Sequence, residues 1–171
     1  NITLSVTSAN INEDGGATAT NVKATLSAHS GRDVTVTLGK SGNAIFGSDY
    51  TLAPTITIKE GSLFGSITLA SVSDPLNEAD EVAVISISFT VNGVDISDPQ
   101  TVTILNDDPL PTVTLSVGSP TIGEPDGTTT VTVTLSAVSG LPVSVTIAKS
   151  GSAVDAVDYN LAGTIIVPEG A

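Results

Sequence analysis

The residues of this 171-residue chain whose types and spacing could do chemistry are its acidic side chains. Residues 74–81 carry four carboxylates, and Asp107 and Asp108 stand together just before a proline. Like charges this close repel one another, and a cation bound through oxygen atoms relieves the repulsion. Ca²⁺ takes about 6–8 oxygen ligands from flexible loops, whereas Mg²⁺ demands a stricter octahedron and keeps several waters. The acidic stretches therefore indicate a Ca²⁺ site, with solvated loop charge as the alternative.

Other kinds of site lack the residues that they need. The chain has no cysteine, which excludes disulfides, zinc ribbons and thiol chemistry. Its single histidine, His29, leaves almost no general-base or imidazole-metal chemistry. Lys and Arg number 5 against 18 Asp and Glu, so no cationic surface for nucleic acid is expected. Paired carboxylates also hydrolyse glycosides, but aromatic residues that would hold a sugar make up only 3%. We therefore expect a protein that is not an enzyme.

The elements that position these carboxylates are expected to be β-strands. The chain is rich in Thr, Val and Ile, whose branched Cβ atoms suit a pleated sheet and crowd a helix. No segment of ten or more residues keeps a helical period, and clusters of Gly, Asn, Asp and Pro separate the apolar runs. Strands are expected where polar and apolar residues alternate or apolar residues dominate, at 3–6, 33–38, 55–58, 66–69, 82–89 and 101–104. About seven short strands at this spacing predict an all-β sandwich.

The chain also contains an internal repeat. Residues 2–6 return as residues 113–117 at an offset of 111. Residues 31–61 return as residues 140–170 at an offset of 109, with 16 of the 31 positions identical. Such agreement does not arise by chance, so the repeat predicts two units of the same fold.

The two predicted units differ in length. Residues 1–108 are interpreted as one complete unit, and residues 109–111 as a short linker stiffened by Pro109 and Pro111. Residues 112–171 are the first half of a second unit and have no counterpart of residues 63–108, which supply about three strands. We expect that the second unit is not self-sufficient and that something else covers its apolar face. Three explanations stay open: a longer native chain, disorder of the second unit, or strands from another subunit.

Four segments of the complete unit resemble the Calx-beta motif in order and spacing, namely residues 13–16, 47–50, 74–81 and 103–108. The resemblance covers all of residues 1–108 and the first half of the motif in residues 112–171. It implies an immunoglobulin-like antiparallel β-sandwich, a fold of sodium–calcium exchanger regulatory domains, integrin β4 and large bacterial surface proteins. It also implies Ca²⁺ ligands, which by their positions in the motif fall on Glu13, Asp49, Asp74, Glu78, Glu81, Asp107 and Asp108.

These observations predict a Ca²⁺-binding structural or adhesive repeat module of an extracellular bacterial surface protein, in which Ca²⁺ stiffens the joint between modules. Its partners would be neighbouring repeats, identical subunits, or an adhesion target on a host or another surface. No insertion into a membrane is expected, since no run approaches the ~20 apolar residues of a spanning helix. Two alternatives stay open: a subunit of an extracellular filament whose second unit is completed by strands of a neighbouring chain, and a Ca²⁺-sensing regulatory domain as in sodium–calcium exchangers.

Overall fold

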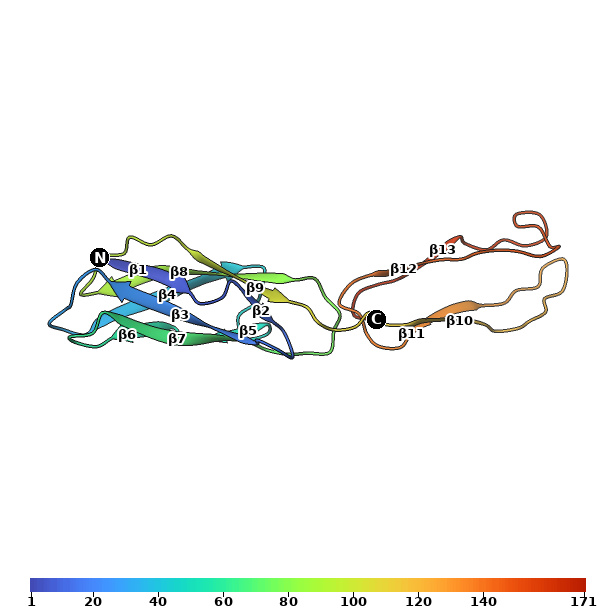
Figure 1. Ribbon diagram of the computed structural model, residues 1–171. Coiled ribbons are helices and arrows are strands. Elements are labelled where there is room, and N and C mark those ends of the chain that lie inside the picture. The colour runs from blue at the N-terminus through green and yellow to red at the C-terminus, as the bar shows by residue number, and fades with distance from the viewer. The chain divides into compact units, whose positions relative to one another are not determined.

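The computed structural model describes every residue from Asn1 to Ala171, and all of its regular elements are β-strands (Figure 1). The chain forms two compact units. The first comprises Asn1–Pro75 and Ala79–Asp108, and the second comprises Leu76–Glu78 and Pro109–Ala171. The chain contains no apolar helix long enough to cross a membrane. The predicted all-β fold is confirmed.

The first unit is a sandwich of two sheets. One sheet is antiparallel throughout and has the strand order β1 (Ile2–Val6), β3 (Ala19–Leu26), β7 (Phe64–Ser71) and β5 (Tyr50–Leu52). The other has the order β2 (Asn10–Asn12), β9 (Gln100–Leu105), β8 (Glu81–Val91), β4 (Val34–Gly42) and β6 (Thr55–Ile58). Its strands are antiparallel except that β2 runs parallel to β9.

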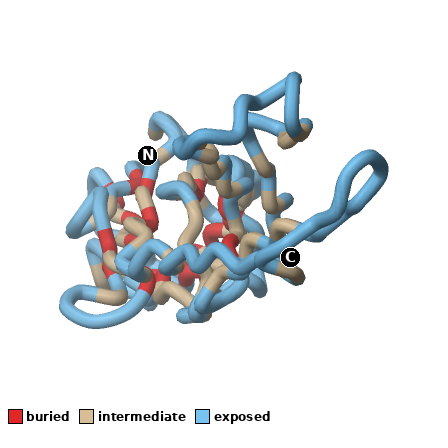
Figure 2. Tube along the Cα trace, turned by 90° about the vertical axis from the view of Figure 1, so that its right-hand side faces the viewer, coloured by how far each residue is buried: buried red, intermediate tan, exposed pale blue.

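The core of the first unit is formed by strand side chains that alternate between buried and partly exposed positions. In β4 the side chains of Val34, Val36 and Leu38 are buried, while the threonines between them stay partly exposed. Ala83 and Ile85 of β8 are buried in the same way. Figure 2 shows the buried residues, drawn in red, gathered in one part of the chain. Burial of a Val or Ile side chain contributes about 1.5–3 kcal/mol, so this core is the main source of stability.

The chain changes sheets between β1 and β2, and this switch brings β2 beside the end of β9. Ser8, in the connection, donates its backbone N–H to Oγ1 of Thr20 at 2.8 Å. Three strands add to those expected from the alternating pattern: the eight-residue β3 and the three-residue β2 and β5. A three-residue strand is too short to show a period of its own, which is why the pattern does not reveal it.

The second unit consists of two hairpins. β10 (Val113–Val117) pairs with β11 (Val131–Leu135), and β12 (Val143–Thr146) pairs with β13 (Thr164–Val167). Ser139 is the one buried residue of this unit. The second unit therefore has strands but no buried apolar core.

Candidate metal centre

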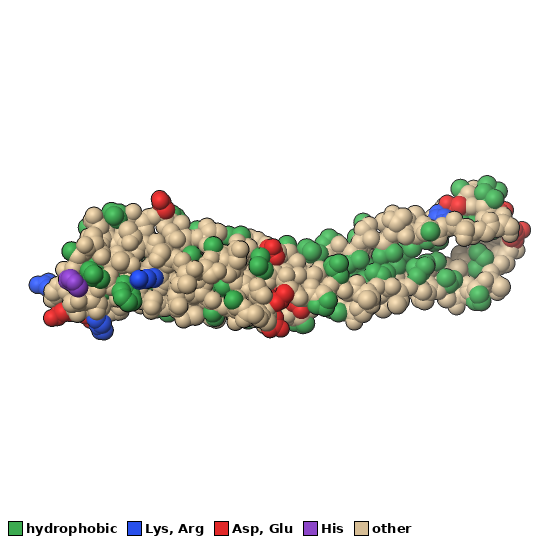
Figure 3. Space-filling model, in the orientation of Figure 1, with side chains coloured by type: hydrophobic (Ala, Val, Ile, Leu, Met, Phe, Trp, Pro, Cys, Tyr) green, Lys and Arg blue, Asp and Glu red, His purple; other side chains and the backbone are tan.

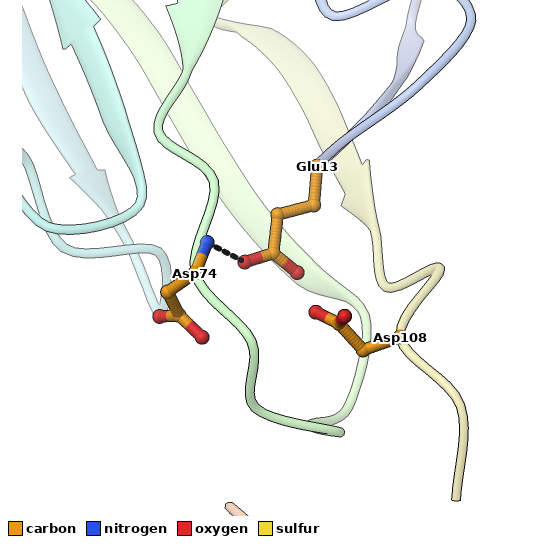
Figure 4. Close-up of side chains that lie close together, drawn as sticks. All are labelled: Glu13, Asp74 and Asp108. Carbon is orange, nitrogen blue, oxygen red and sulfur yellow. Dashed lines mark hydrogen bonds between the residues drawn. The ribbon is translucent and has the colours of Figure 1, made fainter.

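Three carboxylates of the first unit lie close together in space although they are far apart in sequence. Glu13 directly follows β2, Asp74 lies just beyond β7, and Asp108 lies just beyond β9 (Figure 4). Each offers one carboxylate oxygen, and these oxygens lie within 4.8 Å of one another. Glu13 is buried, with 9% of its surface exposed, and the other two are half-buried. We call Glu13, Asp74 and Asp108 the acidic cluster.

Backbone pairing with β9 places Glu13. Asn12 at the end of β2 lies opposite Leu105 at the end of β9, and the Glu13 N–H donates to the carbonyl oxygen of Leu105 at 2.9 Å. The carboxylate of Glu13 then accepts a hydrogen bond at Oε1 from the backbone N–H of Asp74, at 3.3 Å. Figure 4 shows this bond, with the Glu13 and Asp108 carboxylates pointing toward one another.

The hydroxyl of Ser71 ties the end of β7 to the same region. Its Oγ lies 2.9 Å from the carbonyl oxygens of Asn12 and Glu13, and 3.0 Å from that of Thr18. A hydroxyl has a single proton to donate, so these three carbonyls share it. Ser71 thus holds the turn between β2 and β3 against the segment that carries Asp74. Sequence reasoning did not identify this residue.

The turn that follows Glu13 depends on glycine. Gly15 and Gly16 have φ values of +54° and +64°, in the left-handed region that glycine adopts at little cost. The backbone N–H of Asp14 donates to Oδ1 of Asp107 at 3.0 Å, and that of Gly15 donates to Oδ1 of Asp14 at 2.7 Å. Asp107 therefore stabilises the turn from the neighbouring segment.

Asp80 fixes the path of the chain as it leaves β9. Its Oδ1 accepts a hydrogen bond from the backbone N–H of Asn106 at 3.0 Å, directly before the residues that lead to Asp108. Asp80 is not among the ligands that the Calx-beta resemblance implies. Asp80 comes immediately before β8 in the sequence, and Glu81, the first residue of β8, pairs with Ile104 of β9. This position beside the end of β9 is the sequence feature that indicates the role of Asp80.

The structure brings three of the seven implied ligands into one cluster and places the other four outside it. Asp107 contacts the turn after Glu13, and Glu81 begins β8. Glu78 belongs to the part of the chain assigned to the second unit. Asp49 lies in the turn before β5. That these four residues bind Ca²⁺ stays a prediction.

Asp49 has a structural role in its turn. Its Oδ2 accepts a hydrogen bond from the backbone N–H of Ile45. The second unit repeats the arrangement, since Oδ2 of Asp158 accepts from the backbone N–H of Val154 at 2.7 Å. Burial raises the pKa of the neighbouring Tyr50 hydroxyl, and the negative charge of Asp49 raises it further. Asp49 and Tyr50 recur as Asp158 and Tyr159 in the repeat, so the hydrogen bond of this turn recurs with its residues.

The acidic cluster fits a cation with oxygen ligands. Carboxylate charges at this range repel by on the order of 3 kcal/mol per pair at an effective dielectric constant of 20. The three carboxylates come from loop segments beyond strand ends, and Ca²⁺ takes such ligands in flexible geometry, whereas Mg²⁺ demands a near-ideal octahedron. The donor set therefore suits Ca²⁺ better than Mg²⁺.

Comparison with known proteins gives a likeness of fold. No family model and no curated protein matches the chain. The calcium binding domain CBD12 of CALX1.1 has a TM-score of 0.52 at 19% identity, with 63% of this chain and 45% of that chain covered. CBD12 from CALX1.2 has a TM-score of 0.50 at 18% identity, with 62% and 46% covered. The apo form of the Calx CBD1 domain has a TM-score of 0.50 at 20% identity, with 63% and 98% covered.

The matched region spans less than half the length of the two CBD12 structures and nearly all of the single CBD1 domain. The likeness confirms the predicted immunoglobulin-like sandwich. At these identities the Calx-beta resemblance of the sequence is supported as a similarity of fold to the Calx domains.

Proposed function

We propose that the first unit is a Ca²⁺-binding structural module of a repetitive extracellular surface protein. The observation that carries the proposal is the acidic cluster, in which carboxylates from the segments after β2, β7 and β9 converge. One ion among them would link three segments that are otherwise joined mainly by backbone hydrogen bonds. The contribution of the ion would therefore be mechanical and not chemical.

The position of Asp108 supports a role in stiffening the chain. Asp108 ends the first unit, and Pro109 begins the main part of the second. An ion held by Asp108 would restrain the backbone at the point where it leaves the sandwich, and Pro109 and Pro111 restrict it further. Extracellular modules bind Ca²⁺ with dissociation constants of about 10⁻⁴–10⁻³ M, so such a site would be filled where Ca²⁺ is millimolar.

The internal repeat favours a structural spacer over a Ca²⁺ sensor. A spacer needs many copies of one module at fixed angles, and its partners are the neighbouring repeats. The second unit keeps counterparts of β1, β3, β4 and β6. Two of the implied ligands, Glu13 and Asp49, fall within the repeated segments, and both are kept there as Glu124 and Asp158.

Thermal unfolding with and without Ca²⁺ tests the proposal. At a Ca²⁺ concentration a hundredfold above the dissociation constant, the free energy of unfolding should rise by about 2.7 kcal/mol relative to EDTA. Glu13→Gln should remove most of this increase, because it deletes a charge while keeping an oxygen for the Asp74 N–H. Asp98→Asn is the matched control, since it deletes an exposed carboxylate outside the acidic cluster.

The quantity compared is the Ca²⁺-dependent shift of each variant and not its melting temperature in EDTA. The Asp98 variant should keep the full shift. Equal shifts for the Glu13 and Asp98 variants, or no shift in the unsubstituted chain, would contradict the proposed site.

A further inference from the structure

The second unit reproduces the strand pairing of part of the first unit residue for residue. The pair Val113 and Leu135 in β10 and β11 corresponds to Ile2 and Leu26 in β1 and β3. The two hairpins also continue in the same register over their whole length. The pairing of β12 with β13 likewise repeats that of β4 with β6.

Hydrogen bonds outside the strands repeat as well. Ser119 donates its backbone N–H to Oγ1 of Thr129 at 2.8 Å, as Ser8 does to Thr20. The amino group of Lys149 donates to the carbonyl oxygen of Leu161, as that of Lys40 does to Leu52. The second unit is therefore the β1, β3, β4 and β6 portion of the same fold, with its local contacts in place.

Two strand edges that are paired in the first unit are open in the second. In the first unit β3 lies between β1 and β7, and β4 lies between β6 and β8. Their counterparts β11 and β12 each have a single strand neighbour. Open edges present unpaired backbone N–H and carbonyl groups, to which a further strand can add.

The apolar face of the second unit is exposed, as its strand edges are. Leu115 is 53% exposed where its counterpart Leu4 is 5% exposed, and Ile122 is 47% exposed where Ile11 is 1% exposed. Figure 3 shows hydrophobic side chains, drawn in green, at the surface of this unit.

A cavity of about 420 Å³ opens in this face of the second unit, and its lining includes Ile122, Val131, Tyr159 and Leu161. Their counterparts in the first unit, Ile11, Val22, Tyr50 and Leu52, are all buried in the core. The cavity therefore occupies the place where the first unit has its packed interior.

We propose that the second unit is an acceptor for a polypeptide segment with the sequence pattern of residues 62–108, which adds a β7-type strand to β11 and a β8-type strand to β12. The strand pairing of the first unit predicts the register in which these strands would add. Ile67 of β7 lies opposite Val22, the counterpart of Val131, and Thr90 of β8 lies opposite Val36, the counterpart of Val145. The segment would fill the cavity with the side chains that β7, β8 and β9 bury in the first unit, among them Leu69, Ala83, Ile85, Val102 and Ile104.

This occupant fits better than a second copy of the half-unit. A second half-unit brings only β1-, β3-, β4- and β6-type strands, whereas the missing positions in both sheets belong to β7, β8 and β9. None of the residues that form the acceptor face belongs to the acidic cluster, so the open strand edges and the apolar face of the second unit do not depend on Ca²⁺.

The test adds a synthetic peptide of residues 62–108 to the full chain and follows amide hydrogen exchange by mass spectrometry. Amides of β11 and β12 should exchange about tenfold more slowly or better, and those of the first unit should not change. Light scattering should give the mass of one chain plus one peptide. A control peptide with Ile85→Asp and Val102→Asp should give no protection, since both side chains are fully buried in the first unit.

Two substitutions in the chain test whether the peptide packs on the partly buried face of β12. Val145→Asp places a charge on the partly buried face of β12 and should abolish the protection, whereas Ser144→Asp on the exposed face should leave it intact. Equal protection by both peptides would overturn the inference. So would β11 and β12 amides that are already protected in the chain alone, or self-association of the chain that the peptide does not reverse.

Discussion

At the scale of single residues, the acidic cluster depends on backbone groups that orient its side chains. Glu13 is held by an N–H bond to Leu105, and its carboxylate accepts the N–H of Asp74. The hydroxyl of Ser71 reaches three carbonyl oxygens around the same turn. The Glu13 carboxylate is therefore set in position by protein contacts before any ion binds, which lowers the cost of ordering it on binding.

Ser71→Ala should both destabilise the first unit and weaken Ca²⁺ binding. Loss of this hydrogen bond costs about 1 kcal/mol of unfolding free energy, and the turn that bears Glu13 loses its tie to β7. Chemical denaturation measures the first effect, and calorimetric titration with Ca²⁺ measures the second. Ser66→Ala on the exposed face of β7 is the control and should change neither quantity. Unchanged Ca²⁺ affinity in the Ser71 variant would show that this residue does not position the acidic cluster.

At the scale of elements, the alternating pattern predicts most of the long strands, although not the eight-residue β3, and it misses the short ones. The alternation in β4 and the apolar run in β8 follow from the side chains that each strand buries, so both are readable. β2 and β5 are not readable, because three residues show no period and their pairing is set by strands distant in sequence. The parallel contact of β2 with β9 is what delivers Glu13 to the acidic cluster.

The residues of the candidate site also fall into those that the sequence predicts and those that it does not. Acidic residues in three of the four motif segments point to the region where Glu13, Asp74 and Asp108 meet. The supporting roles of Ser71 and Asp80 are hydrogen bonds to backbone groups of other segments. Ser71 does not stand out by type or spacing. Asp80 lies in the acidic stretch of residues 74–81, but its hydrogen-bond partner is defined only once β8 has paired with β9. These roles therefore needed the three-dimensional structure.

At the scale of the whole molecule, the chain is a tandem array in which one unit has a closed core and the other has an open apolar face. If Ca²⁺ at Asp108 restrains the backbone that leads to Pro109, the ion should narrow the range of conformations of the full chain. Small-angle scattering should give a narrower distribution of interatomic distances with millimolar Ca²⁺ than with EDTA. The Asp108→Asn variant should show no difference between the two conditions. Identical curves for the unsubstituted chain would remove the stiffening role.

The central claim is that Ca²⁺ binds at the acidic cluster, and a crystal structure of the full chain grown with millimolar Ca²⁺ tests it most directly. We predict an ion bound by carboxylate oxygens of Glu13, Asp74 and Asp108, at Ca–O distances of about 2.3–2.6 Å. A structure in which these three side chains carry no ion, while Ca²⁺ occupies another place in the molecule or none, would contradict the account.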